Sequence, residues 1–285
     1  LPILLACQAA LRGCRVHAID ISAQMLGATL ARGQMLGVAG IGTQQAGFLS
    51  FELPEGSLDC ATTQYALHHL NDSRSQRILW LLEELGKPYE VVRYQRDPVT
   101  NLAPPELKAV HPLGKSPVIS DGDKTLAESG AILEYLSQTY GVGRFTPAAG
   151  TPEWLRYTYF MHYAEGSLMP LLFMKLVFGR LPTRVPIFMR PVARAIASGA
   201  DKTLLGPQIS NHFAFLESEL AQRDWFAGNE FTAADIQMSF PIEAAAARAG
   251  LGGHMPRLQA FLDRIHARPA YKRALEKGGA FELLK

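Results

Sequence analysis

A passage rich in glycine, proline and threonine at Gly141–Pro152 divides this chain into two parts with different periodicities. Before the passage, short apolar stretches typical of strands alternate with helical repeats. After it, apolar residues recur only at helical spacing, with short breaks at glycines and prolines. We therefore interpret the passage as a linker between an α/β region and an all-helical region built as a helix bundle.

The region before the linker has its own order of elements. In chain order, we expect a strand at 64–70, a helix capped by Asp72 or Ser73 and ending before Gly86, a strand at 89–94, a short helix at 105–110, strands at 117–120 and 125–126 around an Asp121-Gly122 turn, and a helix from about Glu128. The order β-α-β-α-β-β-α suits a compact thioredoxin-like sheet.

The first 58 residues show a third pattern of expected helices and strands. A helical opening at residues 4–11 leads through Gly13 into an apolar strand, Val16–Ile19, which ends at Asp20. A second helix is expected from Ser22 to the glycines at 37, 40 and 42, and further strands at 48–51 and 58–70. Alternation of helix and strand indicates part of a parallel α/β sheet.

Composition narrows the class of protein. The 285 residues are 48% hydrophobic and 19% charged, which is typical of a globular chain with a large core. The formal net charge of +2 and the lack of a Lys/Arg-rich run give no footprint for nucleic-acid binding. The longest apolar stretch, Leu168–Phe178, is far shorter than the roughly 20 residues of a membrane-spanning helix, so we expect no membrane partner.

Cysteine and histidine usage excludes two further kinds of site. The cysteines Cys7, Cys14 and Cys60 all precede residue 61, so no disulfide framework is expected and a reducing, cytoplasmic compartment fits. The eight histidines form neither an HExxH motif nor a Cys/His cluster. We therefore predict no metal.

The segment Ser73-Arg74-Ser75-Gln76 follows the first strand of the thioredoxin-like region, where helix N–H groups favour an anion. It lacks the C-x-x-C of a redox enzyme of this fold, so any reactive thiol must belong to a ligand. The Ser73 hydroxyl could donate a hydrogen bond to a ligand thiolate. The alternative is a plain helix N-cap, which spacing alone favours.

Two further pairs of residues have candidate binding roles. A cis bond between Ser116 and Pro117 would leave the N–H and C=O of Ser116 free to pair with an extended peptide, although base rates favour an ordinary trans proline. At the start of the next helix, Glu128 could meet an ammonium group and Ser129 a carboxylate. Simple helix capping is the alternative there.

Three ordered runs closely resemble bacterial and fungal glutathione transferases: HHLNDSRSQRILWLLEELGKPYEVVRYQRD, APPELKAVHPLGKSPVISDG and LAESGAILEYL. The resemblance as a whole covers roughly residues 66–276. The resemblance implies that glutathione is a co-substrate. It also implies a glutathione site consisting of Ser73 near the sulfur, the Ser116 backbone at the cysteinyl unit ahead of a cis Pro117, Glu128 and Ser129 at the γ-glutamyl end, and Lys115 at the glycyl carboxylate.

The helical region offers a folding signal and a candidate substrate surface. Phe231-Thr232-Ala233-Ala234-Asp235 has the form of a capping box with Thr232 as N-cap, and we assign it to stability. The first long helix carries Trp154, Tyr157, Phe160, His162 and Tyr163, which would line an apolar site for the electrophile if this helix faces the cleft as the resemblance implies. We name Tyr157, Phe160 and Tyr163 as pocket candidates and expect most of the set to be core.

The first part of the chain resembles a different family. RGCRVHAIDISAQML and LPEGSLDCATTQYALHHLND are similar to class I methyltransferases that use S-adenosylmethionine, over residues 3–72, with Asp20 at the ribose position. The glycine-rich turn and the later strands of that fold are missing, and Gly47 stands where an acidic residue often holds the adenine. Residues 68–72 suit both families, so we expect a fusion at this shared sequence.

Together these patterns predict a partial methyltransferase-like α/β fragment at 1–58, a thioredoxin-like glutathione-binding domain at 59–142 and an all-helical domain at 150–285. The predicted function is a cytoplasmic, homodimeric glutathione transferase that adds glutathione to a small electrophile or reduces a peroxide. The alternatives are a non-catalytic glutathione-binding module and an S-adenosylmethionine-dependent methyltransferase.

Overall fold

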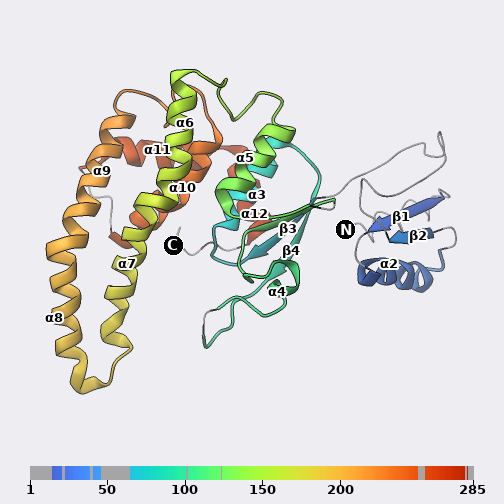
Figure 1. The fold of residues 1–285 in the computed structure, drawn as a ribbon, viewed down its shortest axis with the longest axis horizontal. Helices are drawn as coiled ribbons and strands as arrows, with labels where there is room; N and C mark the ends of the chain where they lie inside the picture. The colour runs from blue at the N-terminus through green and yellow to red at the C-terminus, as the bar shows by residue number, and fades with distance from the viewer. Residues whose placement is uncertain are drawn as a thin grey trace. The chain divides into compact units, whose positions relative to one another are not determined.

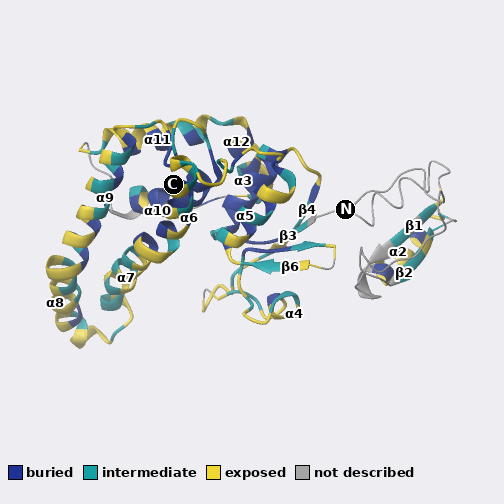
Figure 2. Cartoon of the chain, turned by 45° about the horizontal axis from the view of Figure 1, so that its top comes forward, coloured by how far each residue is buried: buried dark blue, intermediate teal, exposed yellow. Residues whose placement is uncertain are grey.

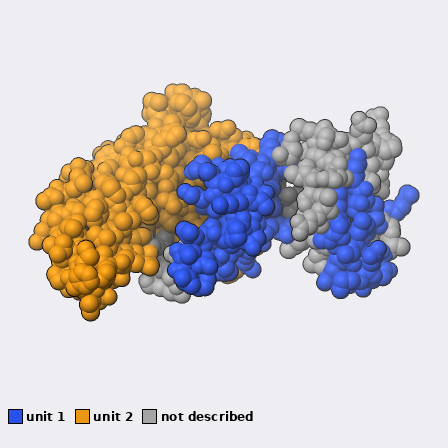
Figure 3. Space-filling model, turned by 60° about the horizontal axis from the view of Figure 1, so that its bottom comes forward, with its two compact units in different colours: residues 1–70, 87–128 blue, residues 71–86, 129–285 orange. Residues whose placement is uncertain are grey.

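The computed structural model describes residues 15–20, 23–38, 41–45, 65–100, 102–122, 124–249, 254–279 and 281 (Figure 1). The predicted helix at 4–11 and the strands at 48–51 and 58–64 lie outside these residues. The chain forms two compact units (Figure 3). Unit 1 comprises Leu1–Leu70 and Lys87–Glu128, and unit 2 comprises Asn71–Gly86 and Ser129–Lys285.

The N-terminal part of unit 1 is a β-α-β fragment. Strand β1 (Val16–Asp20) and strand β2 (Ile41–Gln45) pair in parallel and are joined by helix α2 (Ala23–Met35). The parallel α/β character predicted for this part is therefore confirmed. Of the glycines at 37, 40 and 42 expected to end the helix, Gly37 lies just beyond its last residue, Met35, whereas Gly42 lies in β2, so the expectation is wrong for Gly42. This strand escaped prediction because its sequence, IGTQQ, has a single apolar side chain.

A four-stranded sheet forms the second part of unit 1. Its strands are β3 (Tyr65–Leu70), β4 (Tyr89–Tyr94), β5 (Val118–Asp121) and β6 (Lys124–Ala127), in the order β4-β3-β5-β6. β3 and β4 run parallel, whereas β5 is antiparallel to both β3 and β6. This mixed sheet, with the short helix α4 (Leu107–Val110) between β4 and β5, is the predicted thioredoxin-like arrangement.

His68 lies in the central strand β3 and is buried. Its Nδ1 is 3.2 Å from the Tyr94 hydroxyl on β4, and its Nε2 is 3.1 Å from the Ser120 hydroxyl on β5. Burial lowers the pKa of this imidazole, so a neutral ring that donates one hydrogen bond and accepts the other fits the site. The ring therefore links three neighbouring strands across one face of the sheet.

Unit 2 begins with helix α3 (Ser75–Leu85), which packs on α5 (Ser129–Tyr140) and α12 (Pro269–Gly278). α3 ends at Gly86, whose φ of 65° is the left-handed cap that the sequence predicts. Ring packing anchors the helix, since Trp80 meets Tyr271 of α12 edge-to-face at 5.0 Å. α3 is buried over most of its length because helices of unit 2 cover several of its faces.

The remaining helices follow the Gly141–Pro152 linker. They are α6 (Pro152–Tyr163), η1 (Ala164–Leu168), α7 (Met169–Arg180), η2 (Leu181–Thr183), η3 (Ile187–Met189), α8 (Arg190–Ala200), η4 (Asp201–Leu205), α9 (Gly206–Leu220), α10 (Ala233–Ala249) and α11 (Pro256–Ala267). α6-η1-α7 and α8-η4-α9 are each continuous, with one π-helical turn, and α7 and α8 form the end of a helical hairpin (Figure 1). Nearly all of α10 is buried among its neighbours (Figure 2). The prediction of an all-helical region is confirmed for the residues described.

The predicted capping box at the start of α10 is present in a modified form. Asp235 accepts hydrogen bonds from the Thr232 N–H at 2.8 Å and from the Phe226 N–H at 2.8 Å. The Thr232 hydroxyl also donates to this carboxylate, at 3.1 Å, in place of accepting from the Asp235 N–H. Burial raises the pKa of Asp235 to about 6, and these donors act in the opposite direction.

Replacement of Asp235 by alanine should lower the free energy of unfolding by about 2–4 kcal/mol, because it leaves buried N–H donors without an acceptor. Urea denaturation at neutral pH measures this loss. The exposed Asp224 is the matched control, and Asp224→Ala should change the same quantity by less than about 0.5 kcal/mol. Equal effects of the two substitutions would contradict the capping role.

Candidate functional site

The residues predicted to bind glutathione divide between the two units. Lys115, Ser116, Pro117 and Glu128 belong to unit 1. Unit 2 contains Ser73, Ser129 and the three pocket candidates of helix α6.

Ser73 lies between β3 and α3 and is only 6% exposed. Its Oγ accepts a hydrogen bond from the Ser75 N–H at 3.2 Å, so the serine does cap the first turn of the helix. The two hydroxyl oxygens of Ser73 and Ser75 are 2.6 Å apart, and either can donate. When Ser75 donates, the Ser73 oxygen is filled as an acceptor and its own proton is left for a further acceptor. Capping and donation to a ligand are thus compatible.

Arg74 and Arg77 join the start of α3 to the π-helical segment η1. Arg74 Nε lies 2.9 and 3.0 Å from the two carboxylate oxygens of Glu165, and Arg77 Nη2 lies 2.5 Å from one of them. The Arg77 side chain is 1% exposed. Its Nη1 also donates to the backbone and side-chain oxygens of Gln237 in α10, at 2.7 and 2.8 Å.

This cluster brings two cations and one carboxylate to the helix start. Both guanidinium groups stand over the Phe240 ring, about 5 Å from its centroid. Burial alone would raise the pKa of Glu165, but Arg77 and Arg74 outweigh it and hold this pKa below its usual range. The carboxylate therefore stays ionised at neutral pH. It holds in place two arginines that follow Ser73 by one and four residues in the sequence.

Sequence reasoning did not identify this cluster. Arg74 and Arg77 are three residues apart, which places them at neighbouring positions on one helix face. This spacing is the sequence feature that could have indicated the cluster. Glu165 lies in η1, beyond the linker, in a π-helical turn that no local pattern announces. Its role became visible only from the folded unit.

Ser116 holds its loop against the end of β3. Its hydroxyl donates to the His68 carbonyl at 2.8 Å and accepts from the Leu70 N–H at 3.2 Å. The peptide bond to Pro117 is cis, as the family resemblance implied. Within the described part of the chain, no hydrogen bond is recorded for the N–H or C=O of Ser116. The side chain is thus used by the fold, and the backbone groups remain available to a ligand.

Lys115, Glu128 and Ser129 have simpler surroundings. Lys115 and Glu128 are exposed, and Glu128 has a φ of 70°, which turns the chain at the end of β6. Ser129 is the first residue of α5 and is 3% exposed. The roles of these three residues in binding glutathione stay predictions.

The pocket candidates of α6 are packed inside unit 2. Phe160 stacks among aromatic rings, with the Phe226 centroid 4.8 Å away. The Tyr163 hydroxyl is hydrogen-bonded to His212 Nδ1, and burial raises the pKa of this tyrosine. Burial also raises the pKa of Tyr157 to about 12, and its hydroxyl makes no well-formed hydrogen bond in the described residues. Core packing accounts for all three, and their contact with a substrate stays a prediction.

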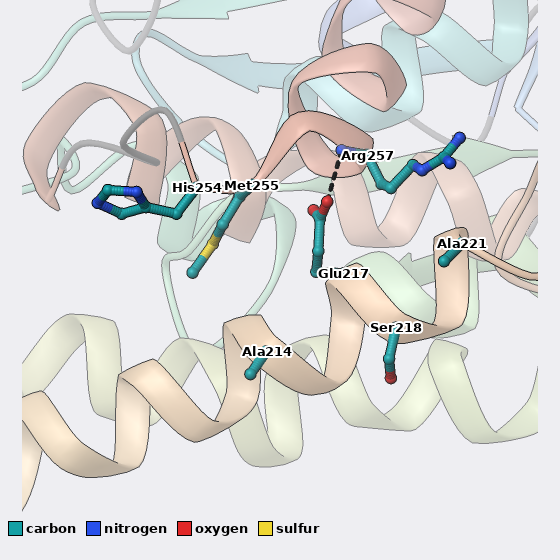
Figure 4. A pocket seen from close by; sticks show the side chains of 7 residues that line it. All are labelled: Ala214, Glu217, Ser218, Ala221, His254, Met255 and Arg257. Atoms are coloured by element: carbon teal, nitrogen blue, oxygen red, sulfur yellow. Dashed lines mark hydrogen bonds between the residues drawn. The ribbon is translucent and has the colours of Figure 1, made fainter.

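A shallow cavity of about 390 Å³ lies beside helix α9 (Figure 4). Its lining residues are Ala214, Glu217, Ser218, Ala221, His254, Met255 and Arg257. The Glu217 carboxylate accepts from the N–H groups of Arg257 at 2.7 Å and Leu258 at 2.9 Å, so it caps helix α11. This carboxylate has a structural use, and the predicted site residues lie elsewhere.

Replacement of Glu165 by glutamine should lower the free energy of unfolding by about 1–3 kcal/mol at pH 7, because the two arginines lose their anion. A pKa lowered by folding contributes stability above the pKa of the unfolded group, and that stability is lost as the pH falls through the folded-state pKa. The difference between wild type and Glu165→Gln should therefore shrink below about pH 4.

Urea denaturation at pH 7, 5 and 3.5 provides the measurement. Glu276→Gln, at an exposed position of α12, is the matched control and should leave the free energy of unfolding nearly unchanged. A Glu165→Gln difference that stays constant over this pH range would argue against the ion pairs as the source of stability.

Comparison with protein-family models matches three segments of the chain. The N-terminal domain of glutathione S-transferase matches residues 63–138, and the C-terminal domain of that family matches residues 181–269. A methyltransferase domain matches residues 3–88, which overlaps the first of these segments. The methyltransferase-like fragment expected from the sequence is therefore supported.

Strand pairing decides how the overlapping residues are used. β3 pairs with β4 and β5 in the four-stranded sheet, whereas β1 and β2 form a separate two-stranded sheet. In the described residues β3 thus belongs to the thioredoxin-like sheet, although both families match its sequence. The fusion expected at residues 68–72 agrees with this arrangement.

Relatives that match about three quarters of this chain agree with the family models. Glutathione S-transferase 3 of Schizosaccharomyces pombe is 38% identical over 211 residues, which are 74% of this chain and 86% of the relative. Glutathione S-transferase 1 of Saccharomyces cerevisiae is 32% identical, with 75% and 95% covered. The crystal structure of a glutathione S-transferase from Actinobacillus pleuropneumoniae is 34% identical, covers 77% of this chain and 95% of its own, and superposes with a TM-score of 0.63. The chain therefore belongs to the glutathione S-transferase family of enzymes, and carries a methyltransferase-like fragment at its front.

Proposed function

We propose that this protein binds glutathione as a thiolate and adds it to an electrophilic small molecule, or uses it to reduce a peroxide. The observation that carries the proposal is the Ser73 hydroxyl, whose oxygen accepts from the Ser75 N–H and which can donate its proton onward when the Ser75 hydroxyl donates to it. Family membership supplies the co-substrate. One solved relative, 26% identical with a TM-score of 0.55, is a sphingomonad glutathione S-transferase complexed with glutathione.

The start of α3 suits a thiolate for physical reasons. A free thiol titrates near pH 8.5, so only a few per cent is ionised at neutral pH. A hydroxyl donor, the dipole of a helix start and the net positive charge of Arg74 and Arg77 over their shared partner Glu165 each favour the anion. Lowering the thiol pKa by about one unit corresponds to roughly 1.4 kcal/mol and raises the reactive fraction nearly tenfold.

We assign the other parts of glutathione to the residues that the family resemblance implies. The Ser116 backbone pairs with the cysteinyl unit, beside the cis Pro117. Glu128 and Ser129 receive the γ-glutamyl ammonium and carboxylate, and Lys115 the glycyl carboxylate. The partner-free backbone of Ser116 in the described residues supports the first assignment, since an extended peptide needs such groups.

The setting of the reaction is part of the same proposal. Cysteines confined to the first 60 residues fit a reducing, cytoplasmic compartment. We also assign the working form to a homodimer, as the family resemblance implies. The electrophile contacts one or two of Tyr157, Phe160 and Tyr163, of which Tyr163 is the most exposed at 6%.

Ser73→Ala should lower kcat/KM for conjugation by about 10- to 1000-fold, as loss of a donor to a reacting anion does. It should also raise the pKa of bound glutathione by about one unit in a pH–rate profile. Ser137→Ala is the matched control, because Ser137 is equally buried in unit 2 and its hydroxyl makes no hydrogen bond in the described residues. An unchanged pH profile in Ser73→Ala would transfer the role to another donor, with Ser75 as the next residue to replace.

The methyltransferase match motivates a second measurement. The described part of the fragment is a two-stranded sheet with one helix, so the fragment should not hold S-adenosylmethionine. A thermal-shift assay should show stabilisation by glutathione and none by S-adenosylmethionine. A rise in Tm with S-adenosylmethionine would favour the methyltransferase alternative, and glutathione binding without turnover of several electrophiles would favour a binding module.

A further inference from the structure

Arg74 has a guanidinium group that the fold uses only in part. Its Nε lies 2.9 and 3.0 Å from the two carboxylate oxygens of Glu165. Its Nη1 and Nη2 amino groups carry further N–H donors, and no hydrogen bond from them is recorded within the described parts of the chain. The side chain is 38% exposed, so these donors are open to a ligand.

Arg77, one helical turn further on, is used differently. Its Nη1 donates to the backbone and side-chain oxygens of Gln237, and its Nη2 donates to Glu165. This side chain is 1% exposed, so it serves the interior of unit 2. Of the two arginines, Arg74 is therefore the one that presents donors to solvent.

Several contacts hold the Arg74 guanidinium in one orientation. Glu165 accepts from its Nε with both oxygens, and this carboxylate is itself held by Arg77. The guanidinium also stands 5.3 Å from the centroid of the Phe240 ring. A side chain that is already fixed has little conformational entropy left to lose when it binds. Donors that are held in advance where negative charge develops are the kind of group that stabilises a transition state.

The position of Arg74 in the chain connects it to the sulfur site. It follows directly after Ser73, the residue to which the proposed function assigns the glutathione sulfur, and it is the N-cap residue of α3. Consecutive Cα atoms are about 3.8 Å apart, which is shorter than the reach of an arginine side chain. An electrophile bound beside that sulfur is therefore within range of the Arg74 donors.

We propose that Arg74 is a catalytic residue that donates hydrogen bonds to the oxygen of a conjugated carbonyl compound, and that such compounds are the preferred electrophiles of this protein. The inference rests on the proposed transferase function and names a substrate class for it. The free Nη groups of a guanidinium suit this task, because they can bind one oxyanion from two sides.

The reaction moves negative charge from the sulfur to that oxygen. The sulfur lone pair forms a bond to the β-carbon, the C=C pair shifts towards the carbonyl carbon, and the carbonyl π pair moves to the oxygen as an enolate. The enolate then takes a proton from water at the α-carbon, which balances the proton that glutathione released to solvent. Ser73 therefore serves the charge at the start of the addition, and Arg74 serves it at the end.

Glu165 is a positioning residue in this scheme. Its carboxylate is paired with Arg74 and Arg77, and as an anion it would repel an enolate. It acts on the substrate only through Arg74, by holding the Nε of that side chain while the Nη groups stay free. The effects of replacing Glu165 and Arg74 should therefore not add.

Two electrophiles with the same ring test the proposal on the full chain. Cyclohexenone and bromocyclohexene, its allylic bromide counterpart, both receive the sulfur on a ring carbon, but only the ketone forms an enolate. The measurement is kcat/KM for each, corrected for the uncatalysed reaction with glutathione and expressed as the ratio of ketone to bromide. This ratio cancels changes in the folded fraction, since both electrophiles meet the same bound thiolate. Arg74→Gln should lower it about 10- to 100-fold, less than the loss of a fully enclosed oxyanion donor because the side chain is 38% exposed.

Further variants separate charge, position and general disturbance. Arg74→Lys keeps the charge but loses the planar donors, so it should keep the pH–rate profile of the wild type and recover only part of the ratio. Glu165→Gln should lower the ratio about 3- to 10-fold, and adding it to Arg74→Gln should cause no further loss. Arg268→Gln is the matched control, because Arg268 pairs with the Glu84 carboxylate and stands over the Phe231 ring near the other end of α3. It should leave the ratio unchanged.

The outcomes divide this inference from the proposed function. A ratio in Arg74→Gln equal to that of the wild type, or an equal fall in Arg74→Gln and Arg268→Gln, would overturn the role of Arg74. Conjugation of the bromide without enhancement for the ketone would overturn the substrate class and leave the transferase activity standing. If the wild type conjugates neither electrophile, the proposed function fails and this inference fails with it.

Discussion

The buried guanidinium of Arg77 ties together three stretches of unit 2 that are far apart in the sequence. A charge with 1% exposure is tolerated only when it is paired, and Glu165 of η1 and Gln237 of α10 provide those partners. The first turn of α3 is thereby held against two other helical segments. Ser73 lies four residues before Arg77, so its backbone is held by the same contacts. A residue that positions a reacting atom requires such a fixed backbone.

The N-terminal part of the chain is organised by the pairing of one strand, β3, whose sequence matches two families. The sequence of β3 suits both a methyltransferase and a glutathione transferase, and local propensity cannot separate them. Pairing does, because β4 and β5 supply hydrogen-bonding partners on both edges of β3. The methyltransferase-like segment keeps a parallel pair, β1 and β2, linked by α2. The thioredoxin-like sheet thus keeps its pairing on both edges of the strand that both families match.

Aromatic side chains form much of the interior of unit 2. Phe160, Tyr163 and their neighbours fill the interior along α6 and α9, where ring–ring contacts stabilise the core. Two further aromatic side chains of this unit, Phe173 and Phe188, are 59% and 78% exposed in the described chain. Substitution of the buried Tyr157, Phe160 or Tyr163 is therefore expected to lower stability first.

Periodicity, turn residues and three ordered motifs in the sequence determined the linker, the strands β3 to β6, the end of α3 at Gly86 and the identity of the family, because these depend on local chemistry. The polar strand β2 and the cluster of Arg74 and Arg77 with Glu165 emerged only from the tertiary structure. Each of these is decided by partners more than 20 residues away, and a pattern along the chain records which side chains are apolar or charged but not which of them meet.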